Sequence, residues 1–406
     1  MKTERMLPSG TSSMEPMLPK TDDSHLAELS RRILIEGGAL RASIPHAITR
    51  CQIATLVREM NSYYSNLIEG HKTLPRDIER ALHNDYLDDA GMRLNQHLAR
   101  AHIQVETEMG QRLASEPGLN VYGRDFLCWL HASFYRHLPE DAREGRTGSG
   151  QGYPVEIGIP RTYNVDVGTH TPPDYRQMGA FLQRFSDAYQ GDSILDTNRL
   201  PALAAAHHRL AWIHPFGDGN GRVARLQSHA ALIRLGVDGE GLWTLSRGLA
   251  RQRSEYYIRL AGADRTREND LDGRGNLSAQ GLHAFCIFFM QTMLDQIEFM
   301  IRLLDTGKLL NRIADYIHQE SGITQHRDRL ARLLGALVRE GSVTRGQVSD
   351  IVGLKPSAAR QVISLALREG LIQSATPKGP LIIAFPAKVL DAYFPRLFLD
   401  LPYGET

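Results

Sequence analysis

Cysteine is scarce in this chain of 406 residues, and its three copies form no recognisable pattern. Cys51, Cys128 and Cys286 lie far apart and make neither a CxxC zinc motif nor a disulfide framework, which is typical of a reducing compartment. No apolar run approaches the roughly 20 residues of a membrane span, and the N-terminus has no charged-then-apolar signal. We therefore expect a cytoplasmic protein without a membrane partner.

Charge of one sign is also lacking. The 47 lysines and arginines are balanced by 46 aspartates and glutamates, so the chain as a whole has no field that attracts nucleic acid or acidic lipid. Any such surface must be local. With 42% hydrophobic residues, a chain of this length can build two or three domains with sizeable cores.

Apolar spacing divides the chain into segments of different character. Residues 1–24 are rich in Met, Pro, Ser and Thr without periodic apolar positions, and we expect a disordered tail. Residues 25–115 show helical spacing, as in Ile53, Leu56 and Met60, with a break near Pro75. Helical spacing returns from Tyr175, so residues 116–309 are expected to form the main domain of a mostly α fold.

The stretch between Gly145 and Pro173 has a different texture. It is rich in glycine and contains two alternating runs, which predict a short β-hairpin exposed as a flap: Tyr153, Val155, Ile157, and then Tyr163, Val165, Val167. Glycine-rich turns at residues 217–221 and 272–276 interrupt the helices that follow.

Residues 310–406 have the pattern of a winged helix-turn-helix domain. We expect helices at 327–338, 344–351 and 356–368, followed by paired strands at 371–375 and 381–384. Residues 321–380 contain nine basic residues and four acidic ones. DNA binding through residues 321–385, protein docking and formation of a homodimer all remain open at this point.

The densest chemical signal is the segment from Ile213 to Arg225, which runs from one predicted helix into the start of the next. Gly217, Gly219 and Gly221 let backbone amides turn inward, and the positive end of the following helix adds to them. A loop of this kind is an anion-binding nest suited to phosphates.

Four side chains around this loop fit phosphoryl or nucleotidyl transfer. Arg222 and Arg225 lie three residues apart on one helix turn and can grip the same polyphosphate. Asp218 can hold Mg²⁺ together with substrate phosphates. His214 has an imidazole whose ordinary pKa lies near neutrality, so it can take a proton from an attacking hydroxyl.

Other readings of the loop fail on context. A glycine-rich loop is usually only a turn, and a lone histidine at a helix end is usually structural. The loop is no Walker A motif, because no Gly-Lys-Ser/Thr follows, and no dinucleotide GxGxxG, because a helix precedes it. Zinc is disfavoured, since HExxH is absent and the neighbours His207 and His208 cannot both face one ion from a helix.

The segment from His214 to Arg225 resembles the Fic family in every specified position of His-Pro-Phe-x-Asp/Glu-Gly-Asn-Gly-Arg-x-x-Arg. The resemblance implies that His214 is the base and that Asp218 binds Mg²⁺. It further implies an ATP-binding loop that grips the phosphates through Gly219, Asn220, Gly221, Arg222 and Arg225. By the same resemblance, the flap would hold the target segment by β-strand addition through Val155, Ile157 and Val165.

A second stretch, from Ser65 to Gly70, resembles the inhibitory-helix pattern Ser/Thr-x-x-x-Glu-Gly/Asn of the same family. Alone, a serine and a glutamate four residues apart on a helix ordinarily mean a solvated face. Beside a Fic loop, the resemblance implies that Glu69 pairs with Arg225 and keeps the γ-phosphate of ATP from it. We expect an autoinhibited enzyme.

The sequence thus favours a protein adenylyltransferase that moves AMP from ATP to a Ser, Thr or Tyr hydroxyl of a target protein or of itself. Two alternatives stay open: the same site used with another donor or for removal of AMP, and a nucleotide-sensing transcriptional regulator that binds DNA. Tyr256 and Tyr257 are candidates for the adenine contact, although both could equally be core aromatics.

Overall fold

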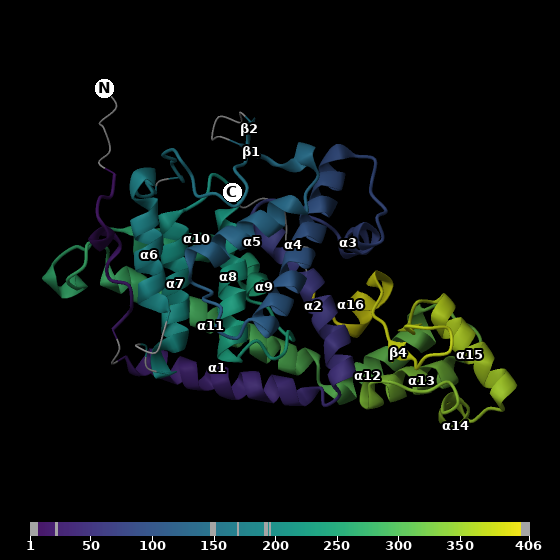
Figure 1. The fold of residues 1–406 in the computed structure, drawn as a ribbon. Helices are drawn as coiled ribbons and strands as arrows, with labels where there is room; N and C mark the ends of the chain where they lie inside the picture. Colours follow the sequence, from purple (N-terminus) through teal and green to yellow (C-terminus); the bar gives the residue numbers. More distant parts are fainter. Residues whose placement is uncertain are drawn as a thin grey trace.

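The computed structural model describes residues 7–20, 23–146, 152–168, 170–190, 194 and 196–398, and its fold is mostly helical, as expected (Figure 1). At the centre lies α11 (Ala279–Leu303), whose buried Phe285, Phe289 and Met293 form the middle of the core. Four helices pack around it: α1 (Ser24–Ser43), α7 (Arg199–Ile213), α9 (Leu245–Arg251) and α10 (Arg253–Asp264).

Among the described residues, α11 is also the one helix long and apolar enough to cross a membrane by length and composition. The most apolar 18-residue stretch of this helix is 61% buried inside the protein. Burial by neighbouring helices gives a core helix the same apolar composition as a membrane span, and α11 has such neighbours along its length.

The remaining helices of the main domain complete the layers around this core. They are α2 (Ala47–Ile68), α3 (Pro75–Leu82), α4 (Ala90–Ser115), α5 (Arg124–Arg136), α6 (Met178–Tyr189) and α8 (Asn220–Leu235). Short 3₁₀ turns occur at Thr11–Met14, Glu140–Ala142, Tyr175–Gln177, Asp196–Asn198, Asp270–Asp272 and Ala387–Val389. The predicted break between the helices near residue 75 is confirmed, because Pro75 occupies the first turn of α3, where no amide hydrogen is needed.

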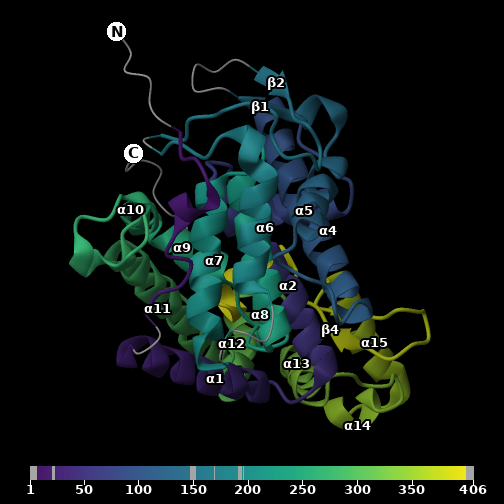
Figure 2. The ribbon, with the colours of Figure 1, turned by 60° about the vertical axis from the view of Figure 1, so that its left-hand side comes forward.

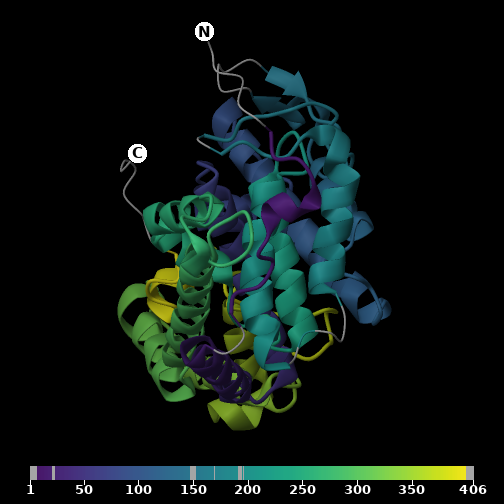
Figure 3. The same ribbon diagram turned by 90° about the vertical axis from the view of Figure 1, so that its left-hand side faces the viewer.

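The expectation of a disordered tail is wrong for residues 7–20, which form a strap over α6 and α7 (Figure 3). Met14 and Met17 are buried, with 0% and 4% of their surface exposed. Glu15 accepts from Arg184 Nε at 3.0 Å, and the Pro16 carbonyl accepts from Arg209 Nη2 at 2.7 Å. Two isolated anchors of this kind leave no periodic signal; residues 1–6 and 21–22 lie outside the described part.

The predicted hairpin is present but displaced along the chain. Strand β1 (Glu144–Arg146) pairs with β2 (Gly152–Pro154), while the predicted second strand around Val165 is irregular, with one isolated bridge from Val167 to His170. The buried Arg161 explains the difference. Its guanidinium donates to the carbonyls of Tyr163, Pro173 and His214 and so ties this stretch to the start of the glycine-rich loop.

The C-terminal domain has the expected order of elements. A helix α12 (Thr306–Asp315) and a π turn (Tyr316–Glu320) lead into α13 (Arg327–Glu340), α14 (Val348–Val352) and α15 (Pro356–Arg368), and then into strand β3 (Ile372–Gln373), strand β4 (Ile382–Ile383) and helix α16 (Leu390–Tyr393). Since α12 begins at Thr306, the predicted domain boundary at residue 310 falls inside a helix. The assignment as a winged helix stays a prediction.

Candidate active site

The glycine-rich loop joins the end of α7 to the start of α8. His214 ends α7 in the left-handed region, with φ 51°, and Gly219 caps α8 with φ 76°. Asn220 fastens the loop: its Oδ1 accepts from the Phe216 amide at 2.9 Å and its Nδ2 donates to the Phe216 carbonyl at 2.8 Å. The Asn220 side chain therefore stabilises the loop itself. The Asn220 backbone amide lies at the positive end of α8, where it can bind a phosphate.

Two residues of α5 that the sequence analysis missed also hold the loop. Tyr135 donates its hydroxyl hydrogen to Asp218 Oδ2. His131 Nδ1 accepts from the Gly158 amide at 2.8 Å, which leaves a hydrogen on Nε2 for the Asp218 carbonyl at 3.2 Å. The four-residue spacing of His131 and Tyr135 on one helix face was the available signal.

His214 lines a cavity of about 430 Å³ next to the loop. Burial, together with the positive charges of His170 and Arg161, lowers its pKa to about 4. This differs from the expected value near neutrality. The imidazole is consequently neutral at pH 7 and has a nitrogen lone pair that can accept a proton.

Arg222 and Arg225, near the start of α8, are buried and turned toward the end of α2. Arg225 donates from Nε to Ser65 Oγ at 2.9 Å and from Nη2 to the Ser65 carbonyl at 2.9 Å. Arg222 donates from Nε to Asn66 Oδ1 at 3.1 Å, and its guanidinium lies 5.1 Å from the ring centre of Phe134. The structure thus brings the predicted inhibitory segment and the predicted phosphate-binding arginines into direct contact.

Glu69 completes this contact. Its Oε1 lies 2.6 Å from Arg225 Nη2, and 29% of its side chain is exposed. Burial raises the pKa of Glu69, but the charges of Arg225 and Arg222 outweigh that effect and hold the pKa below its ordinary value. The carboxylate also lies against the loop: a Cβ atom on Gly221 would come within 2.3 Å of Glu69 Oε1.

Gly70 lets the chain turn away directly after this carboxylate. Its φ of 87° lies in the region that favours glycine, and its amide donates to the Leu67 carbonyl at 3.0 Å. The three predicted inhibitory positions therefore have separate tasks, since Ser65 and Glu69 bind Arg225 while Gly70 ends the helix.

Both candidate adenine residues line the cavity, but they differ in exposure. Tyr256 is 3% exposed, and its hydroxyl is 2.8 Å from His207 Nε2. Tyr257 is 44% exposed and lies beside it, with ring centroids 5.4 Å apart. Only Tyr257 offers an open ring for a base to stack on.

The residues predicted to bind the target are not gathered at this cavity. Val155 is buried, Ile157 packs against the core, and Val165 lies in the irregular stretch. Instead, Val167 and Gly168 line the cavity beside His170. β-strand addition uses backbone atoms, so the burial of the Val155 side chain does not decide it, and target binding at Val155, Ile157 and Val165 stays a prediction.

Asp218 is the predicted metal ligand. In the part of the chain that the structure describes, no three His, Cys, Asp or Glu side chains gather as a ligand set, so a closed structural metal site is not formed there. Oδ2 of Asp218 is taken by Tyr135, and among the described residues Oδ1 has no hydrogen-bond partner. One free carboxylate oxygen beside a phosphate-binding loop fits Mg²⁺, which is commonly held by one or two carboxylates plus substrate phosphates.

Residues 122–232 match the model of the Fic/DOC family, a range that contains the loop and most of α8. The chain is 36% identical over 200 residues to the protein adenylyltransferase Fic of Drosophila willistoni and 35% identical over 206 residues to that of Drosophila grimshawi. These matches cover 48% and 49% of this chain, and 39% and 41% of the two fly proteins. The chain therefore spans about two fifths of the length of these relatives.

Two crystal structures share the fold. A Fic family protein from Desulfovibrio desulfuricans G20 superposes with a TM-score of 0.51 at 16% identity, covering 90% of this chain and 98% of that one. A Fic domain containing signaling protein from Bacteroides thetaiotaomicron VPI-5482 has a TM-score of 0.50 at 16% identity, over 69% of this chain and 97% of its own. At these identities the likeness concerns the fold alone.

Proposed function

Because residues 122–232 give this chain a Fic/DOC-family domain, we propose that it is a protein adenylyltransferase that transfers AMP from ATP to a protein hydroxyl and is inhibited by its own Glu69. The observation that supports this most is the 2.6 Å contact between Glu69 Oε1 and Arg225 Nη2 at the mouth of the phosphate-binding loop. The Glu69 carboxylate pairs with the Arg225 guanidinium, which is the cation that the triphosphate of ATP would otherwise bind.

The proposed reaction uses the loop for the phosphates and His214 for the proton. Backbone amides of Gly219, Asn220 and Gly221 at the start of α8 would hold the α- and β-phosphates. Arg222 and Arg225 would bind the remainder of the triphosphate. The target oxygen attacks the α-phosphorus and the bond from this phosphorus to the bridging oxygen breaks. Pyrophosphate leaves, and the hydroxyl proton goes to the neutral imidazole of His214.

Mg²⁺ would be held by Asp218 and phosphate oxygens, and it would neutralise charge that develops on the leaving pyrophosphate. Tyr135 and His131 keep Asp218 in place for this task, since they bind its carboxylate and its backbone carbonyl. Negative phosphates near His214 would also raise the low pKa of its imidazole, which makes it a better base when ATP is bound.

The test is incorporation of α-phosphate-labelled ATP into protein, with mass spectrometry of the product. Wild type should label weakly, Glu69→Gly about 10- to 100-fold faster because a charge-assisted pair is worth about 1.5–3 kcal/mol, and Glu69→Gly with His214→Ala not at all. Absence of an AMP adduct in Glu69→Gly would remove the proposal. The fully exposed Asp270, replaced by Gly, is a matched control that should behave as wild type.

The same variants separate the related reactions of this site. Labelling from γ-labelled ATP instead of α-labelled ATP would indicate phosphate transfer, and labelling from UTP another donor. Loss of AMP from a pre-modified protein in wild type, but not in Glu69→Gly, would indicate that Glu69 orients water for removal of AMP.

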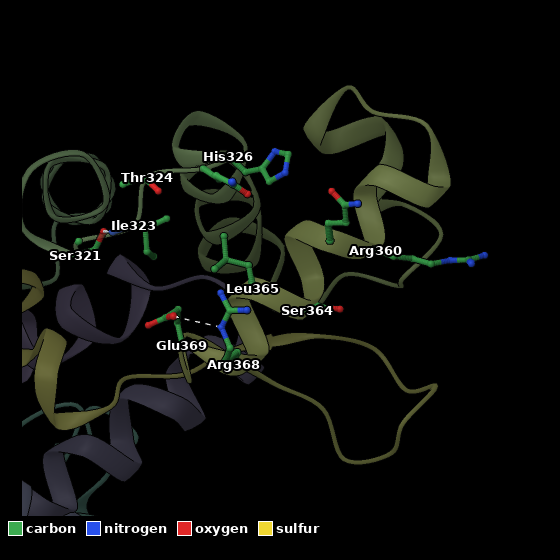
Figure 4. Close-up of a pocket in the computed structure, with 12 residues that line it drawn as sticks. Ser321, Ile323, Thr324, His326, Arg360, Ser364, Leu365, Arg368 and Glu369 are labelled. Atoms are coloured by element: carbon green, nitrogen blue, oxygen red, sulfur yellow. Dashed lines mark hydrogen bonds and ion pairs between the residues drawn. The ribbon is translucent and has the colours of Figure 1, made fainter.

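A second candidate function, binding of DNA, is favoured by the outer face of α15. Arg360, Gln361, Ser364 and Arg368 lie along this face and border a hollow of about 810 Å³ that the loop around His326 closes on the other side (Figure 4). Arg360 extends away from the protein. Among the described residues that line the hollow, Glu369 is the one acidic side chain, and it pairs with Lys388 at 3.0 Å and with Arg368 at 3.7 Å. An exposed polar and basic helix is the element that enters a major groove.

The test of this second function is fluorescence anisotropy with mixed-sequence duplex DNA at several salt concentrations. Binding that weakens as salt rises, and that is weakened further by Arg360→Ala with Arg368→Ala, would support it. Arg302→Ala is the control, because Arg302 is an exposed arginine of α11 outside the hollow. Absence of binding at low salt would remove the DNA function while leaving AMP transfer unaffected.

A further inference from the structure

The end of α2 that carries Ser65 and Glu69 contacts the C-terminal domain as well as the catalytic loop. The Tyr64 hydroxyl donates to the Leu397 carbonyl at 3.1 Å. The ring of Tyr63 packs edge-on against Phe398, with centroids 5.6 Å apart. The two residues directly before the inhibitory segment are therefore held by the last described residues of the chain.

This C-terminal segment, Phe394–Phe398, which we call the latch, is itself fastened to the main domain. Arg247 of α9 donates from Nη2 to the Arg396 carbonyl at 2.7 Å and from Nη1 to Gln296 at 2.9 Å. Phe394 and Leu397 are each 1% exposed. The latch thus lies between α9 and the last turns of α2, and it holds both through buried contacts.

The other end of α2 also rests on the C-terminal domain (Figure 2). Thr49 Oγ1 donates to the Val338 carbonyl at 3.2 Å, and Gln373 Nε2 donates to Gln52 Oε1 at 2.6 Å. A Cβ atom on Gly341 would lie 3.2 Å from that of His46, so the two backbones approach closely. A helix of 22 residues is about 33 Å long, and α2 is held by the C-terminal domain near both of its ends.

The position of Glu69 depends on the last turn of α2. Glu69 is the cap residue after Ile68, and helix ends fray where their carbonyls lack partners. On the cavity side, Arg253 Nε donates to the Ile68 carbonyl at 3.1 Å. On the opposite side, Tyr64 reaches the latch one turn earlier. The reach of Glu69 to Arg225 is therefore set from two sides, one in each domain.

We propose that the C-terminal domain controls the inhibition, because its latch holds the end of α2 in the position from which Glu69 reaches Arg225. Tyr64 is a positioning residue for Glu69, and release of the latch frees Arg225 for the phosphates of ATP. This inference rests on the proposed function. It assigns to the C-terminal domain a task inside the protein, whatever its outer face binds.

The experiment compares Tyr64→Phe with Tyr189→Phe in the chain of 406 residues. Both changes remove one buried hydroxyl that donates to a backbone carbonyl, since Tyr189 binds the Met17 carbonyl at 2.6 Å, but only Tyr64 lies on α2. Tyr64→Phe should raise AMP labelling about three- to tenfold, the range for one hydrogen bond, and Tyr189→Phe should not. In the Glu69→Gly background, Tyr64→Phe should have no effect.

Three results would overturn the proposal: unchanged labelling in a folded Tyr64→Phe protein, an equal gain in Tyr189→Phe, or a similar gain in the Glu69→Gly background. A second readout does not depend on AMP transfer. Amide hydrogen exchange of residues 65–70 should become faster in Tyr64→Phe while that of the catalytic loop stays unchanged. If Glu69→Gly transfers no AMP, the proposed function fails, and the exchange alone decides the latch: faster exchange supports it and unchanged exchange removes it.

Discussion

Asn220 and Phe216 hold each other by two hydrogen bonds across the catalytic loop, and this pair gives the loop its shape. Asn220 is 6% exposed and Phe216 is fully buried. Asn220→Ala leaves the Phe216 amide and carbonyl buried without partners, which should cost about 2–4 kcal/mol of folding free energy. Displacement of the loop amides should lower labelling in the Glu69→Gly background about 100-fold.

Urea unfolding and α-labelled ATP incorporation check this prediction. Asn276→Ala is the control, because Asn276 is exposed and its amide donates to the Ser12 carbonyl outside the site. Unchanged labelling by Asn220→Ala would show that the loop keeps its shape without the pair.

Gly221 is predicted to matter for inhibition as well as for phosphate binding. An alanine there would place Cβ 2.3 Å from Glu69 Oε1 and 3.1 Å from Arg225 Nη1, so the ion pair must shift. Gly221→Ala should destabilise the protein by about 1–2 kcal/mol in the wild-type background and by much less in Glu69→Gly. Urea unfolding of wild type, Gly221→Ala, Glu69→Gly and the double variant measures this difference. Equal destabilisation by Gly221→Ala in both backgrounds would contradict the close contact between Gly221 and Glu69.

Sequence reasoning predicted the features that are local along the chain. Residues such as Ile53, Leu56 and Met60 form a buried stripe on α2. The sequence shows such a stripe as apolar residues that recur every three to four positions. The catalytic loop was predicted because its glycines and its two arginines are contiguous. The contact of Glu69 with Arg225 joins residues 156 positions apart, and only the resemblance to a family pointed to it.

Features that depend on single long-range contacts were missed. Tyr135 reaches Asp218 across 83 residues, and the four-residue spacing of His131 and Tyr135 indicates a shared helix face without indicating Asp218 as the partner. The alternation around Val165 resembled a strand, but hydrogen bonds from Arg161 hold that stretch in an irregular path. Patterns of apolar residues report burial, and they do not report which carbonyl a buried arginine will find.

Buried neutral histidines make the fold sensitive to acid. Burial lowers the pKa of five of them to between about 3 and 4: His102, His131, His207, His214 and His229. When the pH falls below 6.5, the ordinary pKa of histidine, these side chains become protonated in the unfolded chain but stay neutral in the folded protein. The free energy of unfolding therefore decreases as the pH falls. Burial raises the pKa of Glu59 and Glu106 to about 7, and these two act in the opposite sense.

Since the five histidines outnumber the two glutamates, unfolding takes up protons as the pH falls below 6.5. The free energy of unfolding, measured with urea between pH 7 and 5, should therefore decrease steadily. His229→Gln should reduce the slope by about 1.4 kcal/mol per pH unit. A flat profile in this range would contradict the assignment of neutral buried histidines.

The strap of residues 7–20 is predicted to be part of the folded domain. Its Pro16 carbonyl accepts two hydrogen bonds from Arg209, a guanidinium with 0% of its surface exposed, and its Met14 fills a fully buried position. Deletion of residues 1–20 would uncover the Met14 site and leave a buried charge without these acceptors, which should lower the free energy of unfolding by about 3–5 kcal/mol. Deletion of residues 1–6 alone spares every contact named here and serves as the comparison. Thermal melts of the two truncated proteins separate the alternatives, because a dispensable tail would give both the melting temperature of the full chain.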